Sequence, residues 1–286
     1  MSLFDRIFAL IQYPLPHHLL SRLVYWLTRC PWPPLKNIMI RVFIKHFRVD
    51  MGSAQHAGPE HFNSFNEFFT RALKPEARPI AAAAEAIACP VDGTVSQAGK
   101  IEAGRIFQAK GHDYSLATLL GDLPQLHDCF ADGQFATIYL SPRDYHRIHM
   151  PVDGRLRESV YVPGRLFSVN AATTRAIPGL FARNERLVTV FDTPSGPVAV
   201  ILVGAIFVAG IETVWQGNYG ARTFRPFEHR RQAELPQVTL SKGEELGRFN
   251  MGSTVILLFP PGMSEWSADL QPQQTVRMGQ AIGRLL

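Results

Sequence analysis

A change in sequence texture near residue 85 constrains the fold of this 286-residue chain more than any other feature. Before it, prolines between positions 14 and 34 divide the first fifty residues into three segments with apolar residues at helical spacing. After the four alanines at 81–84, short β-rich runs alternate with Gly, Pro and Asp almost to the C-terminus. The sequence therefore predicts an α+β fold: N-terminal amphipathic helices within residues 1–60, then a mainly antiparallel β core within residues 61–286.

Each N-terminal segment carries an apolar stripe. The stripes comprise Leu3, Phe4, Ile7, Phe8 and Ile11; Leu19, Leu20, Leu23, Val24 and Leu27; and Ile38, Met39, Val42, Phe43 and Phe47. Arg41, Lys45 and Arg48 follow a face that adjoins the third stripe. An apolar stripe beside a basic one is typical of helices that lie in a membrane interface, where Trp26 and Trp32 would also fit. Packing of these helices on the core is the alternative interpretation.

The net charge of +5 is concentrated in the same N-terminal region. Residues 1–50 hold seven Lys or Arg and two Asp or Glu, whereas the rest of the chain holds 22 residues of each sign. A basic excess confined to an apolar segment favours an anionic membrane surface over nucleic acid, which would need basic residues spread over a folded face. We therefore expect a membrane partner and no nucleic-acid partner.

Cysteine usage and hydropathy exclude several classes of protein. Cys30, Cys89 and Cys129 lie far apart without a CxxC pair, which predicts neither a disulfide framework nor a cysteine zinc site and fits a reducing compartment. The longest apolar run covers residues 198–211 and contains Gly204. Its 14 residues are too few to span a bilayer, so we interpret the run as buried strands.

A further helix is expected to begin at Ser64. The residues Ser64–Glu67 match the capping-box pattern and lead into the apolar residues that follow. Pro75 is expected to end this helix.

Two short repeats suggest a core built from related halves. Residues 90–93 (Pro-Val-Asp-Gly) recur at 151–154, and the pattern of residues 243–249 recurs at 279–285. The implied unit is strand, turn, strand, so internal pseudo-duplication of the core is a hypothesis. Pro-x-Asp-Gly is also a frequent hairpin turn in any β fold.

The sequence Gly252-Ser253-Thr254 places a hydroxyl directly after an unhindered glycyl carbonyl. A serine oxygen can attack the carbonyl of the preceding residue and convert the amide to an ester, and glycine leaves the path of attack clear. The alternative interpretation is a turn that leads into a buried strand at Val255–Phe259.

Residues 139–151 concentrate two imidazoles, two guanidiniums, a carboxylate and phenols in a short stretch. His146 and His149 without a clear third ligand make a poor zinc site, so we expect no metal. They could instead be ordinary polar residues. In a third interpretation one is a general base for a serine, with an acid to orient it, and the other serves a substrate.

Several longer stretches, in order along nearly the whole chain, identify a family. They are Phe65–Phe69, Asp92–Gly93, Gly99–Ile101, Gln108–His112, Tyr114–Leu116, Ser141–Pro151, Tyr161–Gly164, Leu166–Asn170, Leu180–Arg186 and Ile211–Trp215. With them, the chain resembles the bacterial phosphatidylserine decarboxylases, which are self-processing enzymes that carry a pyruvoyl group. Met251 stands where the family's cleavage motif usually has leucine, a change that conserves volume and flexibility.

The resemblance implies a site and a maturation step. Asp92, His149 and Ser253 correspond to the family's self-cleavage triad. Cleavage between Gly252 and Ser253 would give a large chain, residues 1–252, and a small chain, residues 253–286. Ser253 would become the covalent pyruvoyl group, and the two chains would stay together as a heterodimer, with further dimerisation left open.

The resemblance also implies the reaction and the place of the enzyme. The pyruvoyl ketone would form a Schiff base with the amine of phosphatidylserine, so that CO2 leaves and phosphatidylethanolamine is released. The histidine at position 146 is associated with decarboxylation or proton delivery rather than with cleavage. We expect a peripheral protein on the cytoplasmic face of the bacterial cell membrane.

Two alternatives belong to other classes. A membrane-associated serine hydrolase would use intact Ser253 with His149 and Asp92, but the chain lacks the Gly-x-Ser-x-Gly elbow at this serine. A peripheral membrane scaffold would treat Gly252-Ser253 as a turn only, and would leave residues 141–151 without a role.

Overall fold

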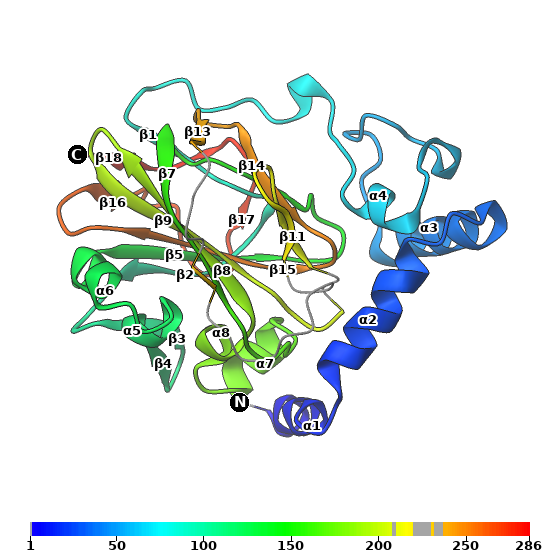
Figure 1. The fold of residues 1–286 in the computed structure, drawn as a ribbon, viewed down its shortest axis with the longest axis horizontal. Helices are drawn as coiled ribbons and strands as arrows, with labels where there is room; N and C mark the ends of the chain where they lie inside the picture. Colours follow the sequence, from blue (N-terminus) through cyan, green and yellow to red (C-terminus); the bar gives the residue numbers. More distant parts are fainter. Residues whose placement is uncertain (1, 208–209, 220–229, 232–236) are drawn as a thin grey trace.

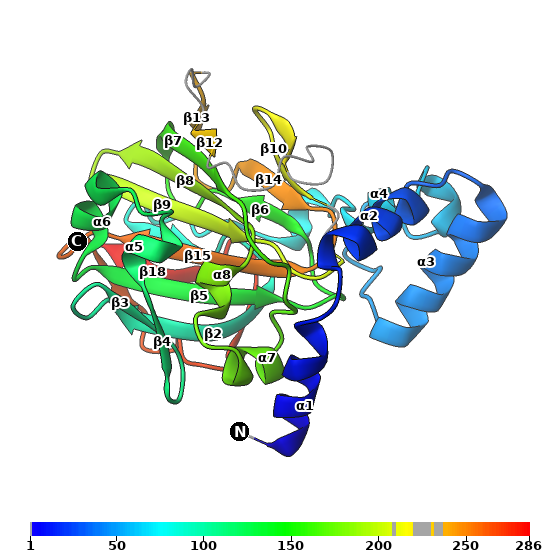
Figure 2. The same ribbon diagram turned by 60° about the horizontal axis from the view of Figure 1, so that its bottom comes forward.

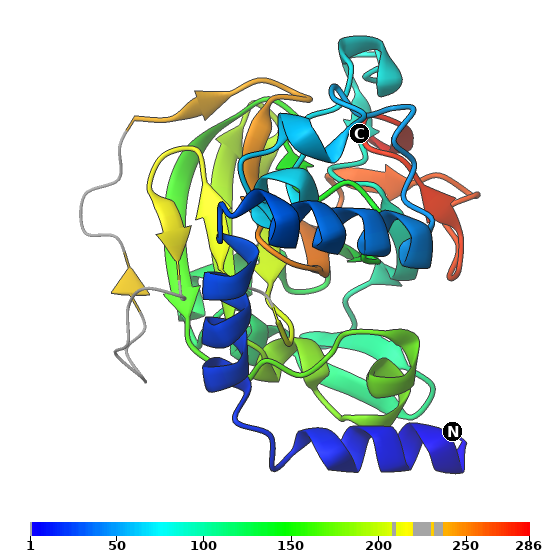
Figure 3. The same ribbon diagram turned by 90° about the vertical axis from the view of Figure 1, so that its right-hand side faces the viewer.

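The computed structural model describes residues 2–207, 210–219, 230–231 and 237–286. Its helices are α1 (Leu3–Gln12), α2 (His17–Thr28), α3 (Pro33–Phe47), η1 (Pro59–His61), α4 (Phe65–Phe69), η2 (Pro75–Ala77), α5 (Leu116–Leu119), α6 (Pro124–Phe130), α7 (Ala171–Ala176) and α8 (Leu180–Arg183). Helices α1 to α3 confirm the three segments predicted from the proline spacing, and they follow one another along one side of the β core (Figure 1, Figure 3).

Strands recur along the chain beyond residue 85. They are β1 (Ala86–Ala88), β2 (Gly93–Lys100), β3 (Arg105–Ala109), β4 (His112–Ser115), β5 (Gln134–Leu140), β6 (Arg147–His149), β7 (Gly154–Val162), β8 (Arg186–Thr193), β9 (Gly196–Val203), β10 (Ile211–Thr213), β11 (Gly217–Tyr219), β12 (Arg230–Arg231), β13 (Thr239–Leu240), β14 (Glu245–Phe249), β15 (Ser253–Phe259), β16 (Ser264–Trp266), β17 (Thr275–Val276) and β18 (Ala281–Leu285). These strands pair antiparallel throughout, which confirms the predicted α+β class.

Strand β15 lies in the interior of the largest sheet. The strand order in this sheet is β12-β7-β8-β9-β15-β5-β2-β17, and β13 also pairs with β7. Ser253 is opposite Leu140 of β5, and the next residue, Thr254, is opposite Val203 of β9. A separate sheet has the strand order β11-β10-β14-β6. Its strand β6 ends with His149, and its strand β14 ends at Phe249, three residues before Gly252.

Two apolar cores lie on opposite faces of the large sheet. Ile256 and Leu258 face the core that helices α5 to α8 cover (Figure 2), whereas Val255, Leu257 and Phe259 face the core shared with β1, β6, β14 and β18. Because successive side chains of a strand point to opposite faces, a strand buried on both sides is apolar without alternation. The run Val255–Phe259 is therefore confirmed as a buried strand.

The 14-residue apolar run at 198–211 is divided between two strands. Residues 198–203 belong to β9, where each side chain is fully buried, and Ile211 begins β10. Residues 204–207 lie outside strands, and residues 208–209 lie outside the described part of the chain. Within the described part, none of the helices has both the length and the hydropathy needed to cross a bilayer.

Helices α1 and α2 turn their polar residues inward. Helix α1 buries Asp5 and Gln12, while Leu3 and Phe4 are 73% and 70% exposed. The Asp5 carboxylate pairs with Arg175 of α7 at 3.0 and 3.1 Å, and Gln12 Oε1 accepts from a backbone N–H of the core. Helix α2 likewise buries His17, Ser21 and Thr28 and exposes Leu19, Leu23, Trp26 and Leu27.

Helix α3 packs on the core with one part of its apolar stripe and exposes the other part. Its Ile40 is buried and its Phe43 ring packs edge-on against Phe65, so part of the apolar stripe belongs to a small core with α4. Its Ile38 and Val42 remain exposed, as do the basic side chains at 41, 45 and 48.

The helix predicted at Ser64 is shorter than expected. The Ser64 hydroxyl accepts from Glu67 N at 3.1 Å, as a helix-capping residue should. The helix ends at Phe69, before Pro75 is reached, and the Thr70 hydroxyl donates to Asn66 O at 3.0 Å. The prediction that Pro75 ends this helix is wrong, since the helix stops six residues earlier, where its aromatic side chains pack in one cluster with α3.

Both sequence repeats occupy equivalent places. The two Pro-Val-Asp-Gly segments lead into β2 and β7, and they are joined by reciprocal hydrogen bonds, Ala88 N to Pro151 O and His149 N to Pro90 O, both 2.9 Å. In the other pair, Gly243 and Gly279 have positive φ values of 83° and 85° and precede β14 and β18. Pseudo-duplication stays a hypothesis, but these turns fit it.

The burial of β15 makes one stability prediction. In a Ser253→Ala background, which removes the candidate nucleophile, Ile256→Ala should lower the free energy of unfolding by about 2–5 kcal/mol, because it leaves a cavity in a fully buried site. Urea unfolding followed by tryptophan fluorescence measures this loss. The exposed Val214→Ala serves as the control, and an equal loss in both variants would contradict the central place of β15.

Candidate active site

Ser253 is the first residue of β15 and is fully buried. Its Oγ has no hydrogen-bond partner among the described residues. The preceding Gly252 does not have a positive φ, and a Cβ placed there would meet only Leu140 O at 3.7 Å and His146 Cε1 at 4.0 Å. Since neither backbone strain nor crowding requires glycine at 252, the residue is better explained by the open carbonyl it leaves beside Ser253.

His146 lies close to this peptide bond, with its Cε1 4.0 Å from the position of a Cβ built on Gly252. Its ring stacks on Phe69 with centroids 4.1 Å apart, and its Nε2 lies 3.1 Å from Ser141 O. A carbonyl can only accept, so Nε2 carries the proton and Nδ1, which has no partner among the described residues, is the free acceptor. Burial, with a smaller effect of Arg71, lowers the pKa of His146 to about 3.

His149 is held by two hydrogen bonds at the end of β6. Its Nδ1 donates to Gly243 O at 2.8 Å, which leaves Nε2 to accept from the Tyr145 hydroxyl at 3.0 Å. Burial is the main cause that lowers the pKa of His149 below its usual value. The ring is therefore neutral near pH 7, as a general base must be.

Asp92 is engaged by Arg78. The Arg78 Nε donates to both carboxylate oxygens at 2.8 and 3.1 Å, its Nη2 makes a further contact, and Met278 N donates to Oδ1 at 2.9 Å. The hydrogen bonds to Asp92 raise the pKa of Arg78 above its usual value. Both side chains are largely buried, so this pair resists competition from water.

Within the described part of the chain, no hydrogen bond joins Asp92, His149 and Ser253 to one another. The backbone does bring two of them close, since His149 N donates to Pro90 O and Asp92 follows two residues later. Of the two imidazoles, His146 and not His149 comes within 4.0 Å of a Cβ built on Gly252. The assignment of these residues as a triad stays a prediction.

A hydrogen-bond network centred on the buried Asn250 anchors the segment before the bond, and none of the sequence patterns predicted it. Asn66 Nδ2 donates to Asn250 Oδ1 at 3.0 Å, and Asn250 Nδ2 donates to Glu212 Oε1 at 2.8 Å. Met251 packs against the aromatic cluster of α3 and α4. Asn66 and Glu212 both lie in stretches that carried the family resemblance, which was a signal that could have found them.

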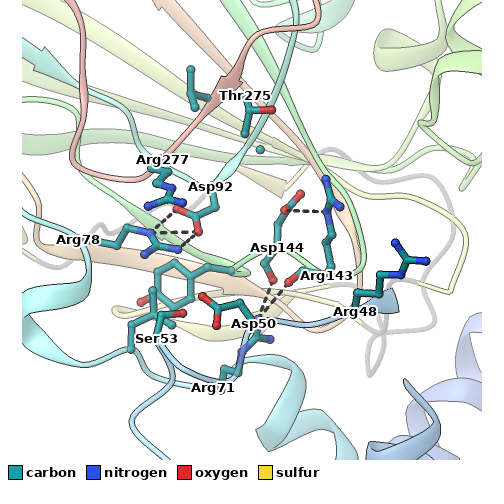
Figure 4. A pocket seen from close by; sticks show the side chains of 14 residues that line it. Arg48, Asp50, Ser53, Arg71, Arg78, Asp92, Arg143, Asp144, Thr275 and Arg277 are labelled. Carbon is teal, nitrogen blue, oxygen red and sulfur yellow. Dashed lines mark hydrogen bonds and ion pairs between the residues drawn. The ribbon is translucent and has the colours of Figure 1, made fainter. Parts of the chain in front are cut away.

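A cavity of about 260 Å³ opens beside Asp92 (Figure 4). Its lining combines five arginines (Arg48, Arg71, Arg78, Arg143 and Arg277) with three carboxylates (Asp50, Asp92 and Asp144). Tyr145, which bonds to His149, lines it as well. Residues that follow helix α3 and the predicted site residue Asp92 therefore line the same cavity.

Among the described residues, no group of three or more His, Cys, Asp or Glu side chains is placed to hold a metal ion. The chemistry that the arrangement offers is acid–base and nucleophilic: two neutral imidazoles, a buried serine hydroxyl and a carboxylate.

Comparison with known families agrees with this chemistry. Residues 65–284 match the model of the phosphatidylserine decarboxylase family, and residues 7–48 match a second model described as PSD. The chain therefore belongs to the phosphatidylserine decarboxylase family, a class of carboxy-lyases.

Curated relatives of similar length share about half of the sequence. A phosphatidylserine decarboxylase proenzyme of Stutzerimonas stutzeri is 53% identical over 98% of this chain and 95% of its own length. The proenzymes of that name from Hahella chejuensis and Azotobacter vinelandii are 50% and 54% identical, over 100% and 98% of this chain and 96% and 98% of their own lengths.

The lowered histidine pKa values predict the pH dependence of the self-cleavage that the family resemblance implies. A base whose folded pKa lies below 6.5 stays neutral above that pH, so the cleavage rate should be flat from about pH 6.5 to 8 and fall only in more acidic buffer. Intact-mass time courses on chain made by cell-free synthesis measure this rate. A rate that climbs steeply between pH 7 and 8 would contradict a neutral imidazole base.

Proposed function

We propose that this chain is a precursor that cuts itself between Gly252 and Ser253 and then decarboxylates phosphatidylserine with a pyruvoyl group formed from Ser253. The observation that carries the proposal is the buried Ser253 hydroxyl, which has no partner among the described residues and follows an unhindered glycyl carbonyl. The word proenzyme in the relatives' names supports a maturation step of this kind.

The cleavage step uses groups of the chain alone. A base removes the Ser253 hydroxyl proton, Oγ bonds to the Gly252 carbonyl carbon, and the Gly252–Ser253 C–N bond breaks to give an ester and a free amine. Loss of the Ser253 α-proton then breaks the Cβ–Oγ bond and releases Gly252 as a carboxylate. Residue 253 is left as a dehydroalanine, which tautomerises to an imine. Water adds to the imine carbon and ammonia leaves, which gives the pyruvoyl group.

The surroundings of Ser253 fit such a group. Residue 253 is sealed from solvent between β5 and β9, and the neutral His146 ring lies against residue 252. The pyruvoyl ketone would bind the substrate amine and withdraw electrons from the carbon that loses CO2. A buried site also keeps water from competing with the substrate for this group.

We assign the two histidines different roles. His149, with its proton on Nδ1, has a basic Nε2 that Tyr145 holds in the uncut chain, and Asp92 is its expected orienting acid. His146 is assigned to proton transfer during decarboxylation, and its unpartnered Nδ1 and its closeness to residue 252 support this role. That closeness also favours His146 as the alternative base for cleavage.

Helices α1 and α2 are proposed to rest on the membrane that contains the lipid substrate. A soluble surface helix normally buries its apolar face, but here Asp5, Gln12 and Ser21 face the core and the apolar stripes face outward. Exposed apolar patches of this kind mark interaction surfaces. Arg41, Lys45 and Arg48 are exposed on or just after α3 and would attract anionic headgroups, which fits a peripheral protein of the cytoplasmic face.

Intact-mass spectrometry of three variants tests the maturation and the histidine roles. Wild-type chain should give a fragment of residues 253–286 that lacks one ammonia relative to simple hydrolysis, whereas His149→Ala and Asp92→Asn should stay uncut. His146→Ala should be cut but should decarboxylate at least about a hundredfold more slowly, the usual loss for an acid–base residue.

The outcomes of this experiment separate the alternatives. If His146→Ala stays uncut and His149→Ala is cut, then His146 is the base for cleavage and the assignment of the two histidines must be reversed. A folded wild-type chain that never cuts would contradict the proposal and favour the hydrolase or scaffold interpretation. Retained urea-unfolding midpoints show that each variant is folded.

A double variant tests the membrane surface. Phe4→Ser with Leu10→Ser removes two exposed apolar side chains from α1 and should weaken binding to anionic vesicles by at least about tenfold, because each buried side chain contributes of the order of 1 kcal/mol or more. Cosedimentation with vesicles measures the binding. Phe107→Ser, an equally simple change at an exposed site on β3, is the control, and equal binding of the two variants would contradict the assignment.

A further inference from the structure

The cavity beside Asp92 has an excess of positive charge that the chain itself does not neutralise. Asp92 is held by Arg78, and Asp144 accepts from both N and Oγ of Ser141. In the described part of the chain, neither Arg48 nor Arg277 has a carboxylate within 4.0 Å. Both are exposed at the rim of the cavity, where a ligand could reach them.

Arg71 gives the strongest evidence that a ligand binds in this cavity. It is only 4% exposed, and its Nη2 donates to the carbonyls of Arg143 and Asp144, but its Nε and Nη1 have no partner among the described residues. Figure 4 shows its side chain rising beside Asp50 toward the Asp144 backbone. A buried guanidinium with two unsatisfied N–H groups is costly unless an anion or another acceptor completes it.

We propose that this cavity binds a phosphate-type oxyanion. Guanidinium groups recognise such anions through paired N–H donors, and here Arg71 supplies two free donors from the floor while Arg48 and Arg277 supply charge at the rim. Hydroxyls of Ser53 and Thr275 also line the cavity. Its volume of about 260 Å³ suits a phosphate group with a small substituent or a few waters better than a large ligand.

The bound oxyanion would act on maturation, and this part rests on the proposed self-cleavage. Arg78 lines the same cavity and holds the Asp92 carboxylate, while His149 is held by Tyr145 and Gly243 instead of by Asp92. An oxyanion competes with Asp92 for Arg78, so its binding frees the carboxylate to turn toward His149. Self-cleavage is therefore faster when the cavity is occupied.

Titration calorimetry on the uncut, full-length Ser253→Ala chain tests the binding. Inorganic phosphate should bind saturably, and Arg277→Gln should weaken the affinity by roughly tenfold, the expected effect of losing one charge-assisted contact. Arg284→Gln removes an exposed arginine on β18 that pairs with Glu265, outside the cavity, and should leave the affinity unchanged. Equal weakening in both variants, or no saturation up to roughly 10 mM phosphate, would overturn the site.

Cleavage rates of wild-type chain from cell-free synthesis test the coupling and the source of the anion. All additions are compared with sodium acetate at constant ionic strength. Cleavage should become several-fold faster in one of two ways: with both inorganic phosphate and glycerol phosphate, or with phosphatidylglycerol vesicles alone. The first result assigns a soluble ligand and the second a lipid headgroup. In either case Arg277→Gln should reduce the response, and a rate that does not respond to any of these additions overturns the coupling.

The two experiments keep this proposal distinct from the proposed function. Phosphate binding to the Ser253→Ala chain requires no cleavage, so it can succeed even when wild-type chain proves inert. Conversely, cleavage that proceeds at one rate with or without phosphate supports the self-processing function and contradicts only the control by the oxyanion.

Discussion

The packing of β15 between β5 and β9 is the constraint on which the rest of the structure depends. The strand is buried on both faces and joins the two apolar cores, and its first residue is the serine at the proposed cleavage site. The pairing of Ser253 with Leu140 and of Thr254 with Val203 therefore fixes the position of Ser253 in the sheet. The segment before it is fixed separately, by the Asn66–Asn250–Glu212 network and by Met251.

Local patterns were sufficient to predict the elements but not the arrangement of the site. The prolines marked the end of α1, both ends of α2 and the start of α3, and the unbroken apolar residues after Thr254 marked a strand buried on both faces. By contrast, the pairing of Arg78 with Asp92 and of Tyr145 with His149 depends on how distant segments pack, which spacing cannot show. The early end of α4 had the same cause, since tertiary contacts outweighed the signal from Pro75.

Within the site, burial and charge divide the titratable groups into two sets. Around the 252–253 bond the surroundings are apolar, and His146 is kept neutral against Phe69. A few residues away the cavity gathers arginines, where Asp144 is the exception that burial pushes toward the protonated form by raising its pKa. Asp92 belongs to the lining of this cavity, where Arg78 holds its carboxylate.

The position of β15 also has a consequence for the fate of a cut chain. The 34 residues from 253 onward supply β15, β16, β17 and β18, each of which is paired with a strand from the other fragment or from its own. Removing this fragment would break three ladders of the large sheet, β15 with β5, β15 with β9 and β17 with β2, and would expose both cores at once. Scission of the backbone would thus leave the topology intact, and dilution or dialysis would not separate the fragments without unfolding the larger one.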